Sequence, residues 1–214
     1  MSRIVVFGGT GYAGSNLVRE AVSRGHDVCV VTRNAPTEPI DGAQYVVGDA
    51  RDAASVRAAV DSADAVLTAL SPRGDMTGRL VEAVEVVAGA ARDAGARLGV
   101  VGGAGSLRTH EGGPYVVDTP GVEEEYKPES REMVALLEWL RAEDSGLDWF
   151  FVSPAVIFGS FAPGERTGTY RVGGDVPVYD ADGNSVISGA DFAVAFLDEV
   201  EAPAHRRERF TVGY

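Results

Sequence analysis

The sequence predicts a doubly wound α/β protein, in which a parallel sheet has helices on both faces and a small C-terminal cap follows it. Short apolar runs alternate with amphipathic segments through residues 1–153. A glycine-rich segment, Gly8–Gly14, separates the first apolar run from the first amphipathic segment. Buried parallel strands read as unbroken apolar runs, so both observations favour repeated β-α units.

The first unit comprises a strand at Ile4–Phe7, a helix that ends near Gly25 and a second strand at Val28–Val31. Leu17, Val18, Ala21 and Val22 form the apolar face of that helix. The pattern continues with strands at 45–47, 65–67, 98–101 and 149–152, and with helices at 53–60, 80–91 and 133–140. These elements fill residues 1–153 of what we expect to be a single domain spanning 1–214.

The pattern changes after Pro154, where a segment with several Gly and Pro residues covers 159–174. Short strands are predicted at 176–179 and 186–187, then a helix around Phe192–Leu197 and a strand at 210–212. We expect residues 154–214 to form a cap on the substrate side of the sheet. The long loop 102–127 is expected to form another wall on that side.

Composition excludes several classes of function. The net charge of −13 disfavours direct binding of nucleic acid, and no stretch has the roughly 18 apolar residues of a membrane span. The three histidines lack Cys or His partners at ligand spacing, so no metal site is expected. A lone cysteine and the absence of a secretory signal pattern predict a cytoplasmic protein, whose oligomeric state stays open.

The glycine-rich segment has the spacing Gly8-x-x-Gly11-x-x-Gly14 between a strand and a helix. In a Rossmann fold, such glycines permit a tight turn, close approach of a pyrophosphate and close packing of helix on strand. We therefore expect the segment to bind a dinucleotide, with Thr10, Tyr12 and Ala13 among the contacts. The alternative is a purely structural turn.

The end of the second strand should lie beside the adenosine ribose, about 20 residues after the motif. Arg33 stands there and no acidic residue does, which favours NADP over NAD, although NAD is not excluded and a solvated arginine is the alternative. Asp49, followed by Ala50, ends the third strand. Its carboxylate is expected either to accept from the adenine amino group or to cap the next helix.

Several motifs together resemble one family. They are Gly8–Gly14, Gly48-Asp49, 101–107, 125–129, 153–155, 164–168 and 209–214. The chain is similar over essentially its whole length to the NADH-flavin reductase-like group of atypical short-chain dehydrogenases, which are related to biliverdin/flavin reductases and NmrA-like proteins. The resemblance implies a Rossmann domain with an NAD(P) site. It also implies that Leu70, Ser71 and Pro154 line the cofactor and that Gly102, Gly103 and Ser106 lie beside the nicotinamide.

The chain departs from the short-chain dehydrogenases that use a Tyr-x-x-x-Lys pair. Lys127 directly follows Tyr126, and residues one apart on a helix do not face each other. Tyr126 with Lys127 stays a candidate proton donor, and an amphipathic tyrosine at the start of a helix is the alternative. Ser106 is expected either to hydrogen-bond a substrate carbonyl or to cap a turn.

Phe158 and Phe161 follow Pro154 at the sheet edge where ligands bind, so they are expected to line a planar substrate or else to pack in the core. The function predicted is an NAD(P)H-dependent reductase of a flavin, quinone or other planar small molecule. The alternatives are a non-catalytic NADP(H) sensor of NmrA type and, ranked last, a sugar-nucleotide epimerase or dehydratase.

Overall fold

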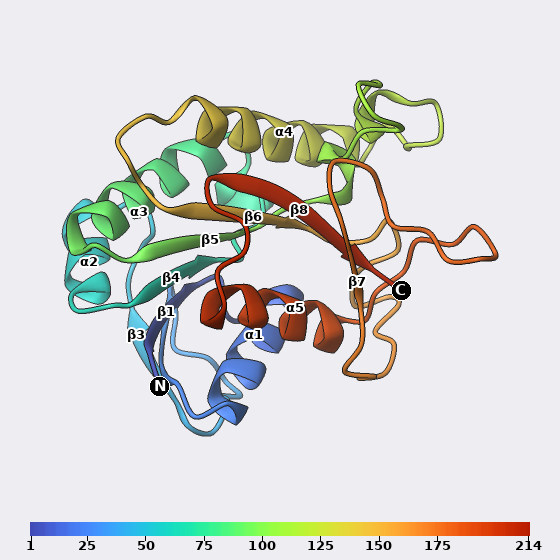
Figure 1. Cartoon of the computed structure of the whole chain (residues 1–214). Coiled ribbons are helices and arrows are strands. Elements are labelled where there is room, and N and C mark those ends of the chain that lie inside the picture. The colour runs from blue at the N-terminus through green and yellow to red at the C-terminus, as the bar shows by residue number, and fades with distance from the viewer.

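A computed structural model describes all of residues 1–214, and its centre is one eight-stranded sheet in the order β3-β2-β1-β4-β5-β6-β8-β7 (Figure 1). Every neighbouring pair is parallel except β7 with β8, which is antiparallel. The strands are β1 (Arg3–Phe7), β2 (Asp27–Thr32), β3 (Ala43–Val47), β4 (Ala65–Thr68), β5 (Arg97–Val101), β6 (Trp149–Ser153), β7 (Arg171–Gly173) and β8 (Glu208–Gly213). The doubly wound α/β prediction is confirmed.

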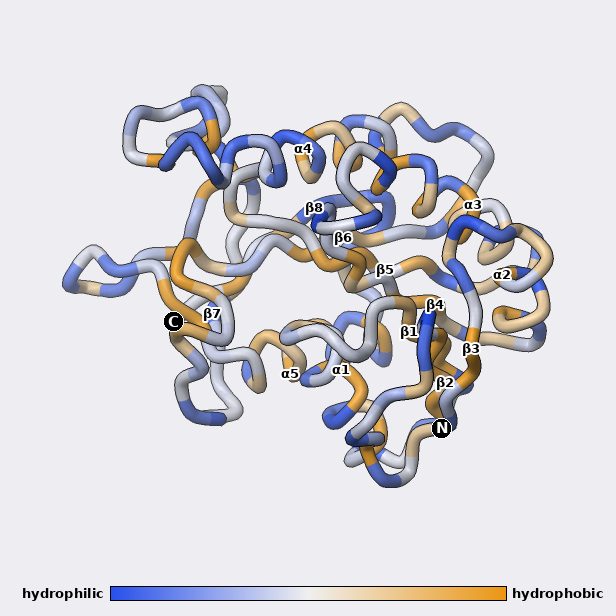
Figure 2. The backbone as a smooth tube through the Cα atoms, turned by 180° about the vertical axis from the view of Figure 1, so that it is seen from behind, coloured by the Kyte–Doolittle hydropathy of each residue, from blue (hydrophilic) through white to orange (hydrophobic).

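Helices cover both faces of this sheet. Figure 1 shows α1 (Tyr12–Ser23) and α5 (Gly189–Glu201) on one face, and α2 (Ala53–Val60), α3 (Leu80–Ala94) and α4 (Lys127–Ala142) on the other. The hydropathy colouring of Figure 2 places the apolar segments along the central strands and the hydrophilic segments in the outer loops. None of the helices is both long and apolar enough to cross a lipid bilayer.

The apolar run of β1 is explained by burial on both faces. Val5 and Phe7 pack in the core beneath α2, α3 and α4, whereas Ile4 and Val6 pack in the core beneath α1 and α5. Successive side chains of a strand point to opposite faces, so a central strand needs apolar residues at every position. The same division holds for β6, where Phe151 faces the first core and Phe150 the second.

The C-terminal residues differ from the predicted arrangement. The strands expected at 176–179 and 186–187 do not form, and β7 lies instead at Arg171–Gly173. Pro177 has no N–H to donate to a ladder, and Val186 makes only an isolated bridge with Ile157. Within residues 154–214, β7 and β8 are strands of the sheet and α5 packs on α1, so the name cap is kept for residues 154–170 and 174–187.

The carboxyl ends of the parallel strands lie at one edge of the sheet. Figure 1 shows the green loop that follows β5 and the orange cap at the same side of the molecule, next to the arrowhead of β8. Ligands of open α/β sheets bind in the crevice outside these carboxyl ends. The candidate functional residues are therefore found there.

Candidate functional site

In the turn between β1 and α1, only glycine fits at two of the three motif positions, Gly8 and Gly14. Gly8 has a positive φ of +80°, and a Cβ there would lie 2.5 Å from the carbonyl oxygen of Ala69. A Cβ on Gly14 would lie 2.2 Å from the carbonyl oxygen of Gly8. At Gly11 the nearest atom is that same oxygen at 3.6 Å, so the protein itself leaves room for a side chain. The outward face of Gly11 is thus open to a ligand.

The N-terminus of α1 presents backbone donors without protein acceptors. Gly11 is the N-cap residue and supplies no side-chain cap, and the first turn of α1 has no acidic residue. The N–H groups of Tyr12, Ala13 and Gly14 make no hydrogen bond within the chain. Free amides at the positive end of a helix dipole form an anion-binding site, which suits a diphosphate.

A hollow of about 500 Å³ lies beside this turn and carries two arginines. Arg33 follows β2 as predicted, and Arg19 comes from the exposed face of α1, where its Nη1 donates to Ser15 Oγ at 3.2 Å. Sequence reasoning missed Arg19 because it considered the apolar face of that helix alone; its spacing of one turn from Ser15 was the available signal. The hollow is also lined by Gly9, Thr10, Thr32, Asn34, Ala35, Pro36, Thr37, Glu38, Ile40 and Tyr45.

Asp49 does not cap a helix, which corrects one of its two expected roles. The N-cap of α2 is Asp52, whose carboxylate accepts from the backbone N–H of Ala54. Asp49 accepts instead from Arg51, through the backbone N–H at 2.9 Å, Nε at 3.1 Å and Nη2 at 2.7 Å. These hydrogen bonds lower the pKa of Asp49 to about 2. Asp49 is therefore a carboxylate at neutral pH, and the adjacent Ala50 is buried.

The ends of β4, β5 and β6 complete the same edge. Leu70 is half-buried and Ser71 exposed after β4, while Pro154 is buried after β6. Gly102 continues the ladder of β5 by donating to the carbonyl of Val152 at 2.8 Å, and a Cβ there would lie 2.0 Å from the ring of Phe151. These residues lie along the same edge as Gly103 and the motif.

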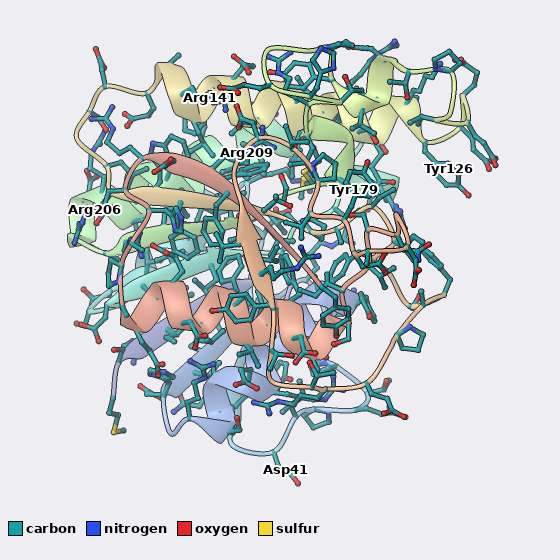
Figure 3. The ribbon with its side chains drawn as sticks, turned by 45° about the vertical axis from the view of Figure 1, so that its right-hand side comes forward. Asp41, Tyr126, Arg141, Tyr179, Arg206 and Arg209 are labelled. Carbon is teal, nitrogen blue, oxygen red and sulfur yellow. The ribbon has the colours of Figure 1, made fainter.

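Ser106 lies beneath this edge and is fully buried. Its Oγ donates to the carbonyl of Gly103 at 2.7 Å and lies 3.4 Å from Ser153 Oγ. The buried guanidinium of Arg209 donates to the carbonyl of Ser106 at 3.3 Å and, through Nε, to Asp175 at 2.7 Å. This arrangement favours the turn-capping role of Ser106 over contact with a substrate. Figure 3 shows Arg141 of α4 near Arg209 of β8, and both arginines donate to Asp175.

Tyr126 and Lys127 do not form a proton-transfer pair. Tyr126 is 52% exposed and, in Figure 3, points away from the body of the molecule. The carboxylates of Glu125 and then Glu123 raise the pKa of Tyr126, the opposite of the effect that a neighbouring lysine would have. The ammonium group of Lys127 instead pairs with Glu124.

The two aromatic residues of the cap have different surroundings. Phe158 is half-buried, with its ring 4.8 Å from that of Phe192 and 5.3 Å from that of Tyr12. The Tyr12 hydroxyl accepts from the N–H of Gly189 at 3.0 Å, which fastens the motif to α5. Phe158 therefore packs as a core residue, whereas Phe161 is 78% exposed.

Comparison with known proteins agrees with this geometry. Residues 8–203 match the family described as NAD(P)H-binding. The chain is 37% identical over 212 residues to YwnB of Bacillus subtilis, a protein described as uncharacterized, and the match covers 98% of this chain and 97% of YwnB.

Two solved structures have similar folds over the whole chain. A candidate NADH-flavin reductase from Streptococcus pneumoniae has a TM-score of 0.89 and 32% identity, over 100% of this chain and 99% of that one. A candidate epimerase from Bacteroides thetaiotaomicron has a TM-score of 0.88 and 35% identity, over 100% of this chain and 97% of that one.

Proposed function

The chain belongs to the NAD(P)H-binding family, and from this premise we propose that it is an NADPH-dependent oxidoreductase that reduces a planar acceptor such as a flavin or a quinone. The observation that carries the proposal is the combination of free amides at α1 with the two arginines of the neighbouring hollow. One anionic ligand with two separated phosphate positions fits both features.

In this proposal the N–H groups of Tyr12, Ala13 and Gly14 bind the diphosphate. Arg33, with Arg19 nearby, binds the 2′-phosphate that distinguishes NADP from NAD. A guanidinium matches phosphate well because it offers several N–H donors in one plane. NADPH is therefore proposed as the preferred form of the cofactor.

The protein's share of the chemistry is binding and orientation. When bound, the reduced nicotinamide supplies the hydride. The buried network around Ser106 holds the loop after β5 at the carboxyl edge, where an acceptor would be aligned. Tyr126 is exposed and its pKa is raised, so the proposed proton source is solvent, which suffices for a flavin or a quinone.

The acceptor is proposed to lie between the loop after β5 and the cap. Phe161 supports an aromatic acceptor because it offers an exposed ring on the cap side of this edge. A cytoplasmic location is part of the proposal, since the enzyme needs a continuous supply of reduced nucleotide.

The test is binding followed by turnover. Calorimetry with NADPH and NADH measures affinity, and the loss of absorbance at 340 nm with a flavin or a quinone acceptor measures hydride transfer. Arg206→Ala is a matched control for Arg33→Ala, because Arg206 is an exposed arginine remote from the hollow that pairs with Asp148. We expect NADPH binding and acceptor-dependent oxidation in the wild type and in Arg206→Ala. Tight NADPH binding without turnover on any planar acceptor would contradict the reductase and favour a cofactor sensor.

A further inference from the structure

An ion pair joins Arg33, which lines the hollow, to the loop after β4. Arg33 Nη1, after β2, donates to Asp75 Oδ2, after β4, at 3.1 Å. β1 lies between β2 and β4 in the sheet, and the turn that follows β1 is the glycine-rich motif. The pair therefore spans the end of β1 and joins the two sides of the candidate nucleotide site.

Asp75 is the only acidic partner of Arg33. The other carboxylate at this edge, Asp49, is hydrogen-bonded three times by Arg51. Arg33 has no other ion pair or side-chain hydrogen bond in the chain, and its side chain is 57% exposed. Asp75 is therefore the hydrogen-bonded acid with which an anion bound to Arg33 must compete.

The segment that carries Asp75 is tied to α4 on both sides. Asp75 belongs to a short 3-10 helix, Gly74–Met76, whose Met76 is buried in the core beneath α3. On one side Arg73 Nε donates to Glu129 at 2.6 Å, and on the other the N–H of Gly78 donates to Glu132 at 2.7 Å. Both acceptors belong to α4, so the loop is tied to a helix.

We propose that Asp75 is a specificity-determining residue, whose carboxylate competes with the 2′-phosphate of NADP for Arg33 and thereby limits the preference for NADPH over NADH. The inference rests on the proposed function and deepens it. A carboxylate and a phosphate both accept charge-assisted hydrogen bonds from a guanidinium, so Asp75, which already holds Nη1 of Arg33, weakens the pull of Arg33 on a second anion. NADH has a 2′-hydroxyl there and does not take Arg33 from Asp75.

Two effects set the size of the change expected for Asp75→Asn. An exposed ion pair such as Arg33–Asp75 favours the nucleotide-free protein over the NADPH complex by a factor of about 1.5 to 5. Asp75→Asn removes this effect. The variant also lacks the repulsion between Asp75 and the phosphate dianion, which is of similar size at an exposed site. The affinity for NADPH should therefore rise about three- to tenfold, while that for NADH changes less than about twofold. Because both groups are exposed, the gain should shrink at high ionic strength.

The experiment is a double-mutant cycle measured by calorimetry with NADPH and with NADH. It uses the wild type, Asp75→Asn, Arg33→Ala and the double variant. Asp93→Asn is the matched control, since it makes the same charge change at an exposed acid paired with Arg92 near the other end of α3. Thermal unfolding of each variant verifies that it is folded.

The expected result is a gain for NADPH in Asp75→Asn that is absent in Asp93→Asn. The gain should be smaller but still present when Arg33 is alanine, because the repulsion between Asp75 and the phosphate does not depend on Arg33. Equal gains for NADPH and NADH, no gain, or an undiminished gain in the Arg33→Ala background would each overturn the inference and leave the proposed function standing. A folded wild-type protein that binds neither nucleotide would overturn both.

Discussion

Gly14→Ala should mainly destabilise the folded protein, whereas Gly11→Ala should mainly weaken NADPH binding. A Cβ on Gly14 would lie 2.2 Å from the carbonyl oxygen of Gly8 and 2.8 Å from the Cα of Gly9. Both atoms belong to the backbone of the tight turn, so the turn or the first part of α1 must move. At Gly11, whose φ is −76°, the same Cβ meets nothing nearer than 3.6 Å. Gly11→Ala therefore needs no rearrangement of the protein.

The magnitudes follow from these distances. Overpacking of this kind costs about 3 kcal/mol, which for a chain of this length lowers the unfolding temperature of Gly14→Ala by about 6–12 °C. Gly11→Ala should lower the free energy of unfolding by only about 1 kcal/mol, because alanine is a poorer N-cap than glycine but its Cβ meets no close atom. Its affinity for NADPH should fall about 10- to 100-fold, since the Cβ occupies the space in which a charged ligand would reach the amides.

Thermal unfolding without nucleotide and calorimetry with NADPH separate the two effects. Gly89→Ala is the control, because a Cβ on Gly89 of α3 meets no atom within 4 Å and alanine favours the helix. It should bind NADPH normally and be slightly more stable than the wild type. If folded Gly11→Ala binds NADPH as tightly as the wild type, the diphosphate does not lie against the start of α1, and the reasoning from the free amides fails.

Four further predictions concern individual side chains. Arg33→Ala should lower NADPH affinity about 10- to 100-fold and spare NADH, measured by calorimetry; equal affinities of the wild type for both nucleotides would refute the phosphate role. Tyr126→Phe should keep the rate of flavin or quinone reduction within about tenfold of the wild type; a loss of about a thousandfold with intact NADPH affinity would show that Tyr126 donates the proton. Ser106→Ala should lower the unfolding temperature and have a smaller effect on the rate of reduction. Burial raises the pKa of Asp191, but hydrogen bonds from Tyr214 and Thr167 outweigh it and the net pKa is lowered. Its stabilising effect is therefore present above about pH 4 and is lost as the pH falls further, so urea unfolding from pH 5 to 2 should be flatter for Asp191→Asn than for the wild type.

Local sequence patterns predicted the features of the fold that depend on burial of a single strand or on a tight turn. The apolar run Ile4–Phe7 reports burial on both faces, and the spacing of Gly8, Gly11 and Gly14 reports a tight turn in which Gly14 lies against Gly8. The strand expected at 176–179 failed for the opposite reason. The strand partner in this region is β8, and its antiparallel register aligns with Arg171–Gly173 instead.

The chemistry of the site was less accessible to sequence reasoning, since it depends on long-range contacts. Ser106 looked available for a substrate, but Ser153 and Arg209, from strands distant in the chain, enclose it. The role of Asp75 could not be predicted because its partner Arg33 lies across the end of another strand. Arg19 carried a signal, its one-turn spacing from Ser15, yet only the folded hollow gives that spacing a meaning.

The place of β8 inside the sheet has a consequence for the order in which the protein can fold during synthesis. When the ribosome has made residues 1–153, the strands β1 to β6 are available, but β6 ends the sheet with an unpaired edge. Phe150 on this strand then lacks its stacked neighbour Phe210 and the ring of Phe196. An open strand edge beside exposed aromatic rings is a site of aggregation. The nascent chain must therefore keep this edge protected until residues 208–213 emerge and insert beside it.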